Sequence, residues 1–230
     1  MGAPVGGVLG DTVAPVLALP AHGFVMLSMP KCASTSMVRS VAGQAEVVLR
    51  VNPKLKHLNC AQFHELMVPL LRKGGYYRKD YEVVSLFREP VEWLESWWRY
   101  RRRPALAEEG SRRFTGEQTF EEFARDYLQR KNRFRGRPAR FVAMSDQLDI
   151  GVDRIFALER PEVWQGWIAE KLDREQEIAT HNVSTERQEP ELSVGLRAEL
   201  EAYFAPEYDI YAHLRDTGTW TPPAGYVPRG

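Results

Sequence analysis

The stretch FVMLSMPKCASTSM, residues Phe24 to Met37, decides the expected fold. Its first part, Phe24 to Met29, is an apolar run of strand length, which is typical of a strand buried on both faces. Pro30 has no N–H to donate and is expected to end that strand. Lys31 and the small residues Cys32 to Ser36 follow, and the residues after them have the apolar spacing of a helix. The stretch therefore predicts a strand, a tight loop and a helix N-terminus.

Such a loop has the properties of an anion site. Consecutive backbone N–H groups at a helix N-terminus carry partial positive charge, and the hydroxyls of Ser34, Thr35 and Ser36 with the Lys31 ammonium add donors for a phosphate or sulfate group. An ordinary strand-to-helix turn with Ser34 as its N-cap is the alternative interpretation. The loop is not a Walker A sequence, because its lysine comes first and it has no glycine. A standard nucleotide triphosphatase is therefore disfavoured.

Length and composition are those of one soluble globular domain. The chain has 230 residues, 43% of them hydrophobic and 27% charged, and no apolar run has the roughly 20 residues needed to span a bilayer. Residues 1–23 contain no lysine or arginine ahead of their apolar residues and do not fit a secretory signal. We expect an arm at 1–23, a domain at 24–215 and a tail at 216–230. Two cysteines without a disulfide pattern favour a reducing compartment, and we expect a cytoplasmic protein.

The net charge of zero hides an asymmetry along the chain. Residues 1–87 hold 9 basic and 5 acidic side chains, residues 88–140 hold 14 and 9, and residues 141–230 hold 8 and 17. A basic front half around the anion loop would attract anionic ligands. Solvated helix faces would give the same excess.

The alternation of strand and helix patterns predicts an α/β fold with a parallel sheet covered by helices on both faces. Ligands bind beyond the carboxyl ends of the strands in such sheets. Besides the strand that begins at Phe24, we expect strands at 46–51, 82–87, 140–144 and 154–158, and helices at 61–73, 91–103, 120–128, 161–172 and 192–204.

Arg88 directly follows the apolar strand pattern at 82–87, as Lys31 follows the first strand. Ser96 comes eight residues later, about two helical turns along the following helix. An arginine fork and a serine hydroxyl suit a second phosphate group. A structural ion pair between Arg88 and Glu92 is the alternative.

Taken together, the PK-small-S-T-S loop, the strand ending in REP and the serine at plus eight resemble the sulfotransferases that use 3′-phosphoadenosine 5′-phosphosulfate (PAPS). The resemblance implies a single-domain, P-loop NTPase-like three-layer sandwich and no metal. It implies a 3′-phosphate site at Arg88 and Ser96. One departure is Cys32-Ala33, where many members carry Thr-Gly or Gly-Thr, and this changes the hydrogen bonds expected of the loop. The residues implied in the 5′-phosphosulfate site are Lys31, Cys32, Ala33, Ser34, Thr35 and Ser36.

The resemblance extends to two further segments. HLNCAQF, residues 57–63, is similar to the stretch with the catalytic histidine in uronyl 2-O-sulfotransferases, which implies that His57 is the base. HNVSTER, residues 181–187, resembles the late loop that closes over the cofactor and implies that Thr185 contacts it. His64, on the apolar helix pattern at 61–73, is the next histidine candidate. Glu65 and Glu92 are the carboxylate alternatives, because some members use a glutamate.

The expected function is transfer of a sulfuryl group from PAPS to a hydroxyl acceptor, a carbohydrate or small molecule, neutral or anionic. Lys31 would stabilise the charge that develops on the leaving oxygen, and a histidine is a natural base near neutral pH. A kinase or other phosphotransferase of the same fold is one alternative. A non-catalytic protein that binds nucleic acid or another acidic polymer is a second, but its expected pI above 9 is absent, since the chain has a pI near 7.0.

Overall fold

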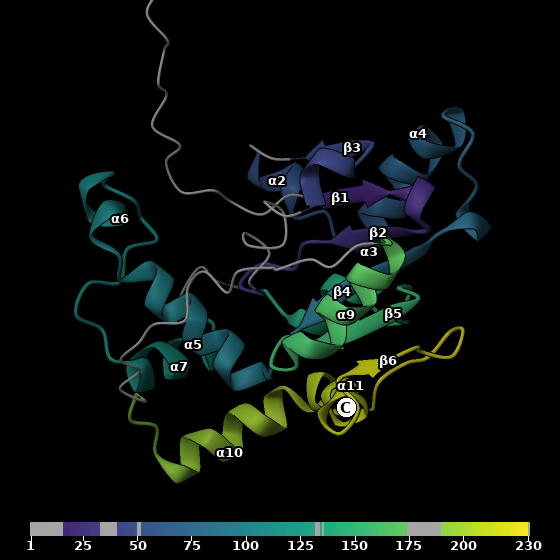
Figure 1. Cartoon of the computed structure of the whole chain (residues 1–230). Coiled ribbons are helices and arrows are strands. Elements are labelled where there is room, and N and C mark those ends of the chain that lie inside the picture. The colour runs from purple at the N-terminus through teal and green to yellow at the C-terminus, as the bar shows by residue number, and fades with distance from the viewer. Residues whose placement is uncertain are drawn as a thin grey trace, which may run out of the picture.

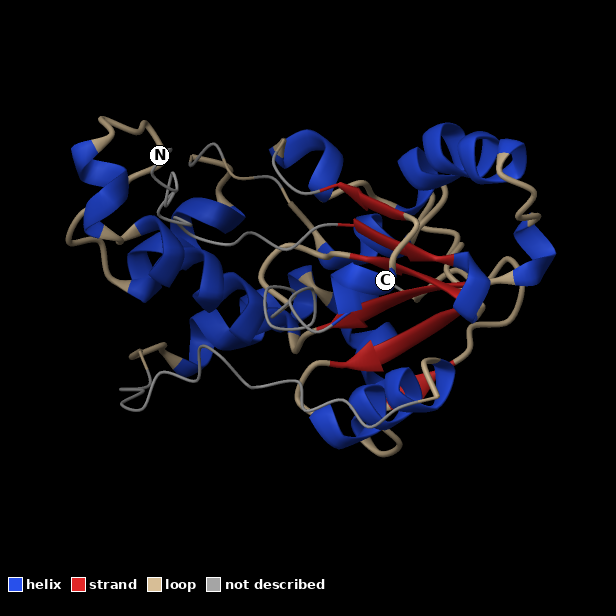
Figure 2. Cartoon of the chain, turned by 45° about the horizontal axis from the view of Figure 1, so that its top comes forward, coloured by secondary structure: helices blue, strands red, loops and turns tan. Residues whose placement is uncertain are grey.

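The computed structural model describes residues 16–32, 41–49, 52–131, 134, 136–173 and 190–229. It contains a six-stranded open sheet in the order β3-β1-β2-β4-β5-β6 (Figures 1 and 2). β2, β4 and β5 run parallel to one another, as expected. β1 is antiparallel to both β2 and β3, and β6 is antiparallel to β5. The strands are β1 Val16–Leu19, β2 Phe24–Leu27, β3 Val47–Leu49, β4 Glu82–Phe87, β5 Arg154–Ala157 and β6 Thr219–Trp220.

The mixed sheet corrects the expectation of a parallel one. β1 comes from the segment expected to be an arm at 1–23, and β6 comes from the expected tail at 216–230. The four residues of β1 are all buried, and the turn after them closes at Gly23, whose φ of 77° suits a residue without Cβ. A short apolar run, a proline and a glycine before another apolar strand are a hairpin pattern. This hairpin was not predicted, because residues 1–23 were treated as one segment.

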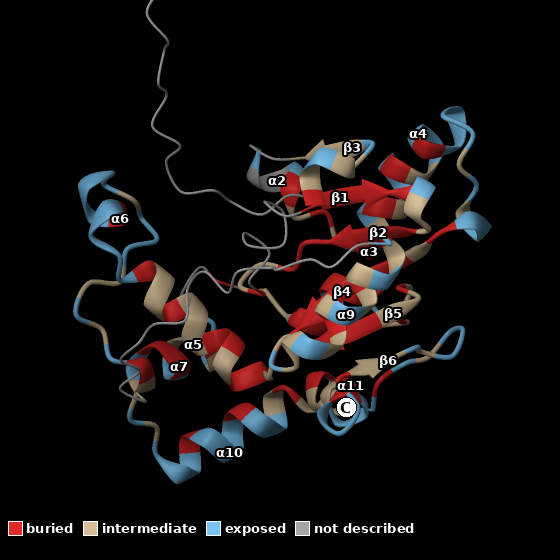
Figure 3. Ribbon diagram, viewed as in Figure 1, coloured by how far each residue is buried: buried red, intermediate tan, exposed pale blue. Residues whose placement is uncertain are grey.

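Helices cover the sheet and also extend beyond it. Every residue of β2 is buried, and so is every residue of β4 after Glu82, so both faces of these strands are covered (Figure 3). On one face, Trp167 of α9 packs its ring 5.2 Å from that of Phe24 and 5.2 Å from that of Phe156. α5, α6, α7 and α10 extend to one side of the sheet (Figure 1). The α-helices are α2 Pro53–Lys56, α3 Cys60–Gln62, α4 Val68–Lys73, α5 Pro90–Arg101, α6 Pro104–Glu108, α7 Phe120–Leu128, α8 Pro138–Val142, α9 Pro161–Lys171, α10 Val194–Tyr203 and α11 Ala205–Arg215; η1 Pro20–His22, η2 Ala42–Gln44 and η4 Arg78–Asp80 are 3-10 helices, and η3 Phe63–Met67 is a π-helix.

The expected strand at 140–144 is wrong, because these residues belong mainly to α8. Pro138 stands at the start of that helix, where its fixed φ and missing N–H are tolerated. Ala143 alone makes an isolated bridge to Ile150. α11 was not expected, although it also has a proline in its first turn and buries Ile210 and Leu214.

The helix expected at 61–73 is divided by the π-helix η3. Val68 donates its N–H to the carbonyl of Phe63, five residues back. Pro69 follows at once and has no N–H for an α-helical bond. The wider turn is how the chain accommodates the proline.

Candidate functional site

The segments that follow β2, β3, β4 and β5 meet at one edge of the sheet. The parallel pairing of β2, β4 and β5 brings their carboxyl ends together, and β3 has the same direction because both it and β2 are antiparallel to β1. Ligands bind at this edge in open α/β sheets. Lys31 follows β2, His57 follows β3 and Arg88 follows β4. The structure therefore brings three predicted site residues to one edge.

Lys31 has a strained backbone and a desolvated side chain. Its φ is 68°, in the left-handed region that a lysine rarely adopts, and the Cys32 N–H donates to the Met29 carbonyl across the turn at 3.3 Å. Its Nζ lies 4.7 Å from the ring centre of Tyr100 and 5.8 Å from that of Trp97. Burial lowers the pKa of Lys31 to about 8, with smaller contributions from Arg103 and Arg88. In the part of the chain that the structure describes, no carboxylate pairs with this ammonium.

His57 is oriented by the segment after β2. Its Nδ1 lies 2.7 Å from the carbonyl oxygen of Ser28. A carbonyl only accepts, so Nδ1 carries the proton in the neutral ring and Nε2 is left as the basic nitrogen. The pKa of His57 is lowered, first by burial and then by Lys56 and Lys31, although the hydrogen bond to Ser28 opposes this. Burial is therefore a larger cause of the lowered pKa than the neighbouring cations.

Arg88 is buried, with 9% of its surface exposed, and one of its guanidinium nitrogens pairs with Glu92 at 3.0 Å. The ion pair expected as the alternative interpretation is thus present. It does not satisfy the whole group, because Nε is buried without a hydrogen-bond partner. Ser96 lies half-buried on α5, and no hydrogen bond joins it to Arg88 in the described region. The Glu92 side chain is 43% exposed and can turn away from Arg88 if an anion binds.

Two aromatic residues and a carboxylate at this edge were missed by the sequence reasoning. Trp93, Leu94 and Trp98 of α5 are buried, whereas Trp97 and Tyr100 of the same helix face Lys31. Their three-residue spacing puts them on one helix face, and this spacing could have indicated from the sequence that they lie together. Arg103 also lies over the Tyr100 ring, at 5.3 Å.

Glu159 follows β5 at the same edge, and its carboxylate accepts the N–H of Glu89 at 3.0 Å. Desolvation of that carboxylate is the main cause of its raised pKa, and Glu92 adds to the rise. The rule that had selected Lys31 and Arg88, a polar residue directly after a buried parallel strand, also selects Glu159.

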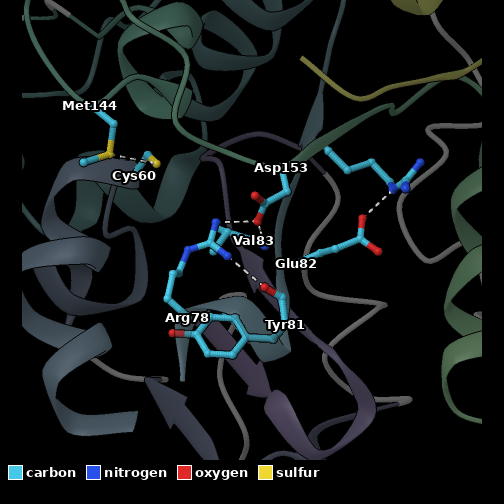
Figure 4. Close-up of polar contacts among 8 residues, drawn as sticks. Cys60, Arg78, Tyr81, Glu82, Val83, Met144 and Asp153 are labelled. Carbon is cyan, nitrogen blue, oxygen red and sulfur yellow. Dashed lines mark hydrogen bonds and ion pairs between the residues drawn. The ribbon is translucent and has the colours of Figure 1, made fainter. Parts of the chain in front are cut away.

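The opposite edge of the sheet holds a set of ion pairs (Figure 4), and His64 lies near Arg78 and Asp153 among them. Arg78 and the Val83 N–H both donate to the Asp153 carboxylate, each at 2.5 Å. Burial lowers the pKa of His64, and the charged groups that also affect this pKa are Arg78 and Asp153. The pKa of His57 is affected by Lys31 instead. His64 therefore belongs to a different neighbourhood from Lys31, and Glu65 beside it is exposed. Of the two histidines, only His57 has Lys31 among the charged groups that affect its pKa.

Several predicted site residues lie outside the described residues: Ala33, Ser34, Thr35, Ser36 and Thr185.

Comparison of the chain with models of protein families, with curated proteins and with solved structures found no match. Among the described residues, no helix is both long enough and apolar enough to cross a membrane, and no three His, Cys, Asp or Glu side chains are grouped to hold a metal ion.

Proposed function

We propose that this protein is a sulfotransferase that moves the sulfuryl group of PAPS to a hydroxyl acceptor, on a P-loop-like α/β scaffold. The observation that carries the proposal is the meeting of Lys31, His57 and Arg88 at the carboxyl edge of the sheet. A lysine, a base and an arginine are what in-line transfer from an anionic donor requires.

The residues present fit such a donor. Lys31 is a desolvated cation that no carboxylate neutralises within the described region, and Arg88 has a buried Nε–H without an acceptor. Both features are costly without an anion, since buried charges and donors are normally paired. A ligand with two anionic groups would satisfy both.

Each residue then has a role. PAPS supplies an activated sulfuryl group with a phosphate leaving group. Lys31 stabilises the negative charge on the oxygen that departs. Arg88 and Ser96 hold the nucleotide by its 3′-phosphate. His57 accepts the proton of the acceptor hydroxyl at Nε2, and the carbonyl of Ser28 keeps that nitrogen free and the ring oriented.

The test is transfer of labelled sulfate from PAPS to hydroxyl acceptors, including phenols, neutral sugars and acidic oligosaccharides. Lys31→Ala is the matched control: we expect it to lose about 10²–10³-fold in kcat, the usual effect of removing one group that stabilises a developing anion. Transfer from ATP with Mg²⁺, and none from PAPS, would establish the phosphotransferase alternative instead.

A further inference from the structure

Arg101, in the last turn of α5, is a buried charge without a counterion. Only 7% of its surface is exposed. Its guanidinium lies 5.0 Å from the ring centre of Phe134 and 5.9 Å from that of Phe123. Its Nε–H is buried and has no acceptor, and no carboxylate pairs with it in the described part of the chain. A cation at a helix C-terminus is favourable, but that role needs no burial, and a buried unpaired guanidinium is costly.

Two more unsatisfied groups lie around the same residue. Thr115 donates its backbone N–H to the Arg101 carbonyl at 3.1 Å, and its own hydroxyl oxygen is buried without a partner. Trp97 lies one helical turn before Arg101, and its buried indole N–H also has no acceptor. The Trp97 ring is 4.8 Å from Phe134, the ring over which Arg101 lies. Clustered buried donors without acceptors indicate a missing acceptor.

The charges nearby are of the same sign. After burial, Arg113 is the next cause that lowers the pKa of Arg101. Two guanidiniums and two neutral donors leave the site short of negative charge. We propose that Arg101, Thr115 and Trp97 bind an oxyanion group, a carboxylate, sulfate or phosphate, at the C-terminal end of α5. This site adjoins the proposed donor site, because the Trp97 ring also lies 5.8 Å from Lys31 Nζ, but its guanidinium is at the other end of α5 from Arg88, which precedes the helix.

Calorimetric titration of the full chain with sodium sulfate, in chloride buffer at constant ionic strength, tests the site. A Lys31→Ala/Arg88→Ala background removes the two cations of the proposed donor site, which are the other candidates for sulfate binding. In that background we expect Arg101→Met to weaken sulfate binding at least tenfold, as loss of a charged hydrogen bond does. Arg112→Met removes the same charge from an exposed position and should change the affinity less than twofold. Without sulfate, Arg101→Met should melt no lower than its parent, because an unpaired buried charge has been replaced by an apolar side chain.

A second titration distinguishes a free anion from one carried by a larger ligand. Binding of inorganic sulfate indicates a site for a free anion. Arg101-dependent binding of a sulfated disaccharide, without binding of inorganic sulfate, indicates a site for an anionic group on a larger ligand. Both results support the site. Thr115→Val keeps the arginine and should weaken the same binding about fivefold, which decides the question even if Arg101→Met fails to fold. The proposal would be overturned if Thr115→Val, and Arg101→Met where it folds, bound every probe with an affinity within twofold of the parent. None of these readouts requires sulfotransferase activity.

Discussion

At the scale of residues, Lys31 combines a left-handed backbone with an ammonium desolvated between two aromatic rings. Backbone strain of this kind costs about 1–3 kcal/mol and is found mostly at functional sites. Pro30 before it and the bond from Cys32 to Met29 hold the turn. With this backbone conformation the Lys31 side chain lies against α5. There it contacts no carboxylate in the described region.

The pKa values of Lys31 and His57 predict a bell-shaped dependence of kcat/KM on pH. The pKa of His57 is lowered from 6.5, so the basic form grows as pH rises through a value below 6.5. The pKa of Lys31 is about 8, so the charged form is lost as pH rises through that value. Activity should therefore be highest between these two limits. The measurement is kcat/KM for transfer from PAPS across pH 5–10.

Two variants assign the limbs of this profile. Lys31→Arg keeps the charge at all pH values and should remove the alkaline limb. His57→Ala should remove the acidic limb and lower kcat by about 10²–10⁴-fold, whereas His64→Ala, at the opposite edge, should leave the profile unchanged. An inactive His64→Ala beside a normal His57→Ala would mean that the base is the other histidine.

Arg88→Ala should act on nucleotide binding instead. We expect weaker binding of adenosine 3′,5′-bisphosphate by about 1.5–3 kcal/mol, the contribution of a hydrogen bond to a charged group. Ser96→Ala should have a smaller effect in the same direction. Adenosine 5′-phosphosulfate lacks the 3′-phosphate, so its affinity is the control and should hardly change. Equal losses for both nucleotides would contradict the 3′-phosphate assignment.

At the scale of elements, one hydrogen bond connects α5 to the turn that contains Lys31. Trp93 is buried, and its indole N–H donates to the Pro30 carbonyl at 3.0 Å. Trp93→Phe removes that bond and should reduce stability by about 1–2 kcal/mol, together with a several-fold loss in kcat, because the adjacent lysine is no longer held. Chemical denaturation and the transfer assay measure the two effects.

Trp98→Phe is the matched control for this connection. The Trp98 indole is also buried and donates to the Gln118 carbonyl at 2.7 Å, on the side of α5 that faces α7. A similar loss of stability with unchanged kcat is expected. If both variants lose activity equally, the effect comes from general loosening of α5 and not from the turn.

How far the sequence predicted these elements depended on the length of each pattern. β4, α5 and α7 were found within about two residues of their bounds. β4 is a nearly unbroken apolar run, and α5 and α7 have a helical period with a proline or a capping threonine at their start. β1 was missed because residues 1–23 were treated as one segment, although it forms a hairpin with β2. β6 has two residues and pairs with a strand that is distant in the sequence, which no local pattern encodes. The candidate site was also predicted only in part. The positions of Lys31 and Arg88 after strands indicated them as site residues. The contacts of Trp97 with Lys31 and of Arg101 with Phe134 depend on how α5 packs.

At the scale of the whole molecule, the two edges of the sheet differ in how their charges are paired. At the amino edge of β4 and β5, Glu82 binds both Arg154 and Lys171, and Asp153 binds Arg78. At the carboxyl edge, Lys31 is not paired with any described carboxylate. Arg88 at the same edge does pair with Glu92, so the difference between the two edges rests on Lys31.

Pairing of the edge strand β6 with β5 depends on Gly218. Its N–H donates to Leu214 at 2.7 Å and its carbonyl accepts from Ala157 at 2.8 Å. A Cβ there would lie 2.9 Å from side-chain atoms of Arg160 and Val163, and its φ is 75°. Gly218→Ala should therefore destabilise the protein by more than about 2 kcal/mol, as measured by denaturation.

Gly225→Ala is a control that separates the cost of a left-handed backbone conformation from the cost of a steric clash of the added Cβ. Its φ of 72° is nearly the same, but a Cβ there would meet open space. We expect a loss of about 1 kcal/mol from the conformation alone. Equal effects of the two substitutions would mean that the packing of Gly218 against α9 does not constrain the chain.

The position of β6 also sets an order of events during synthesis on the ribosome. β1 and β2 are joined by a tight turn and can pair as soon as both have emerged. β6 pairs with β5 across more than 60 intervening residues and comes from the last part of the chain. Until then the outer backbone groups of β5 are unpaired and offer an edge to other nascent chains. A ribosome that pauses after β5 and before Thr219 would prolong that exposure and increase the amount of protein lost to aggregation.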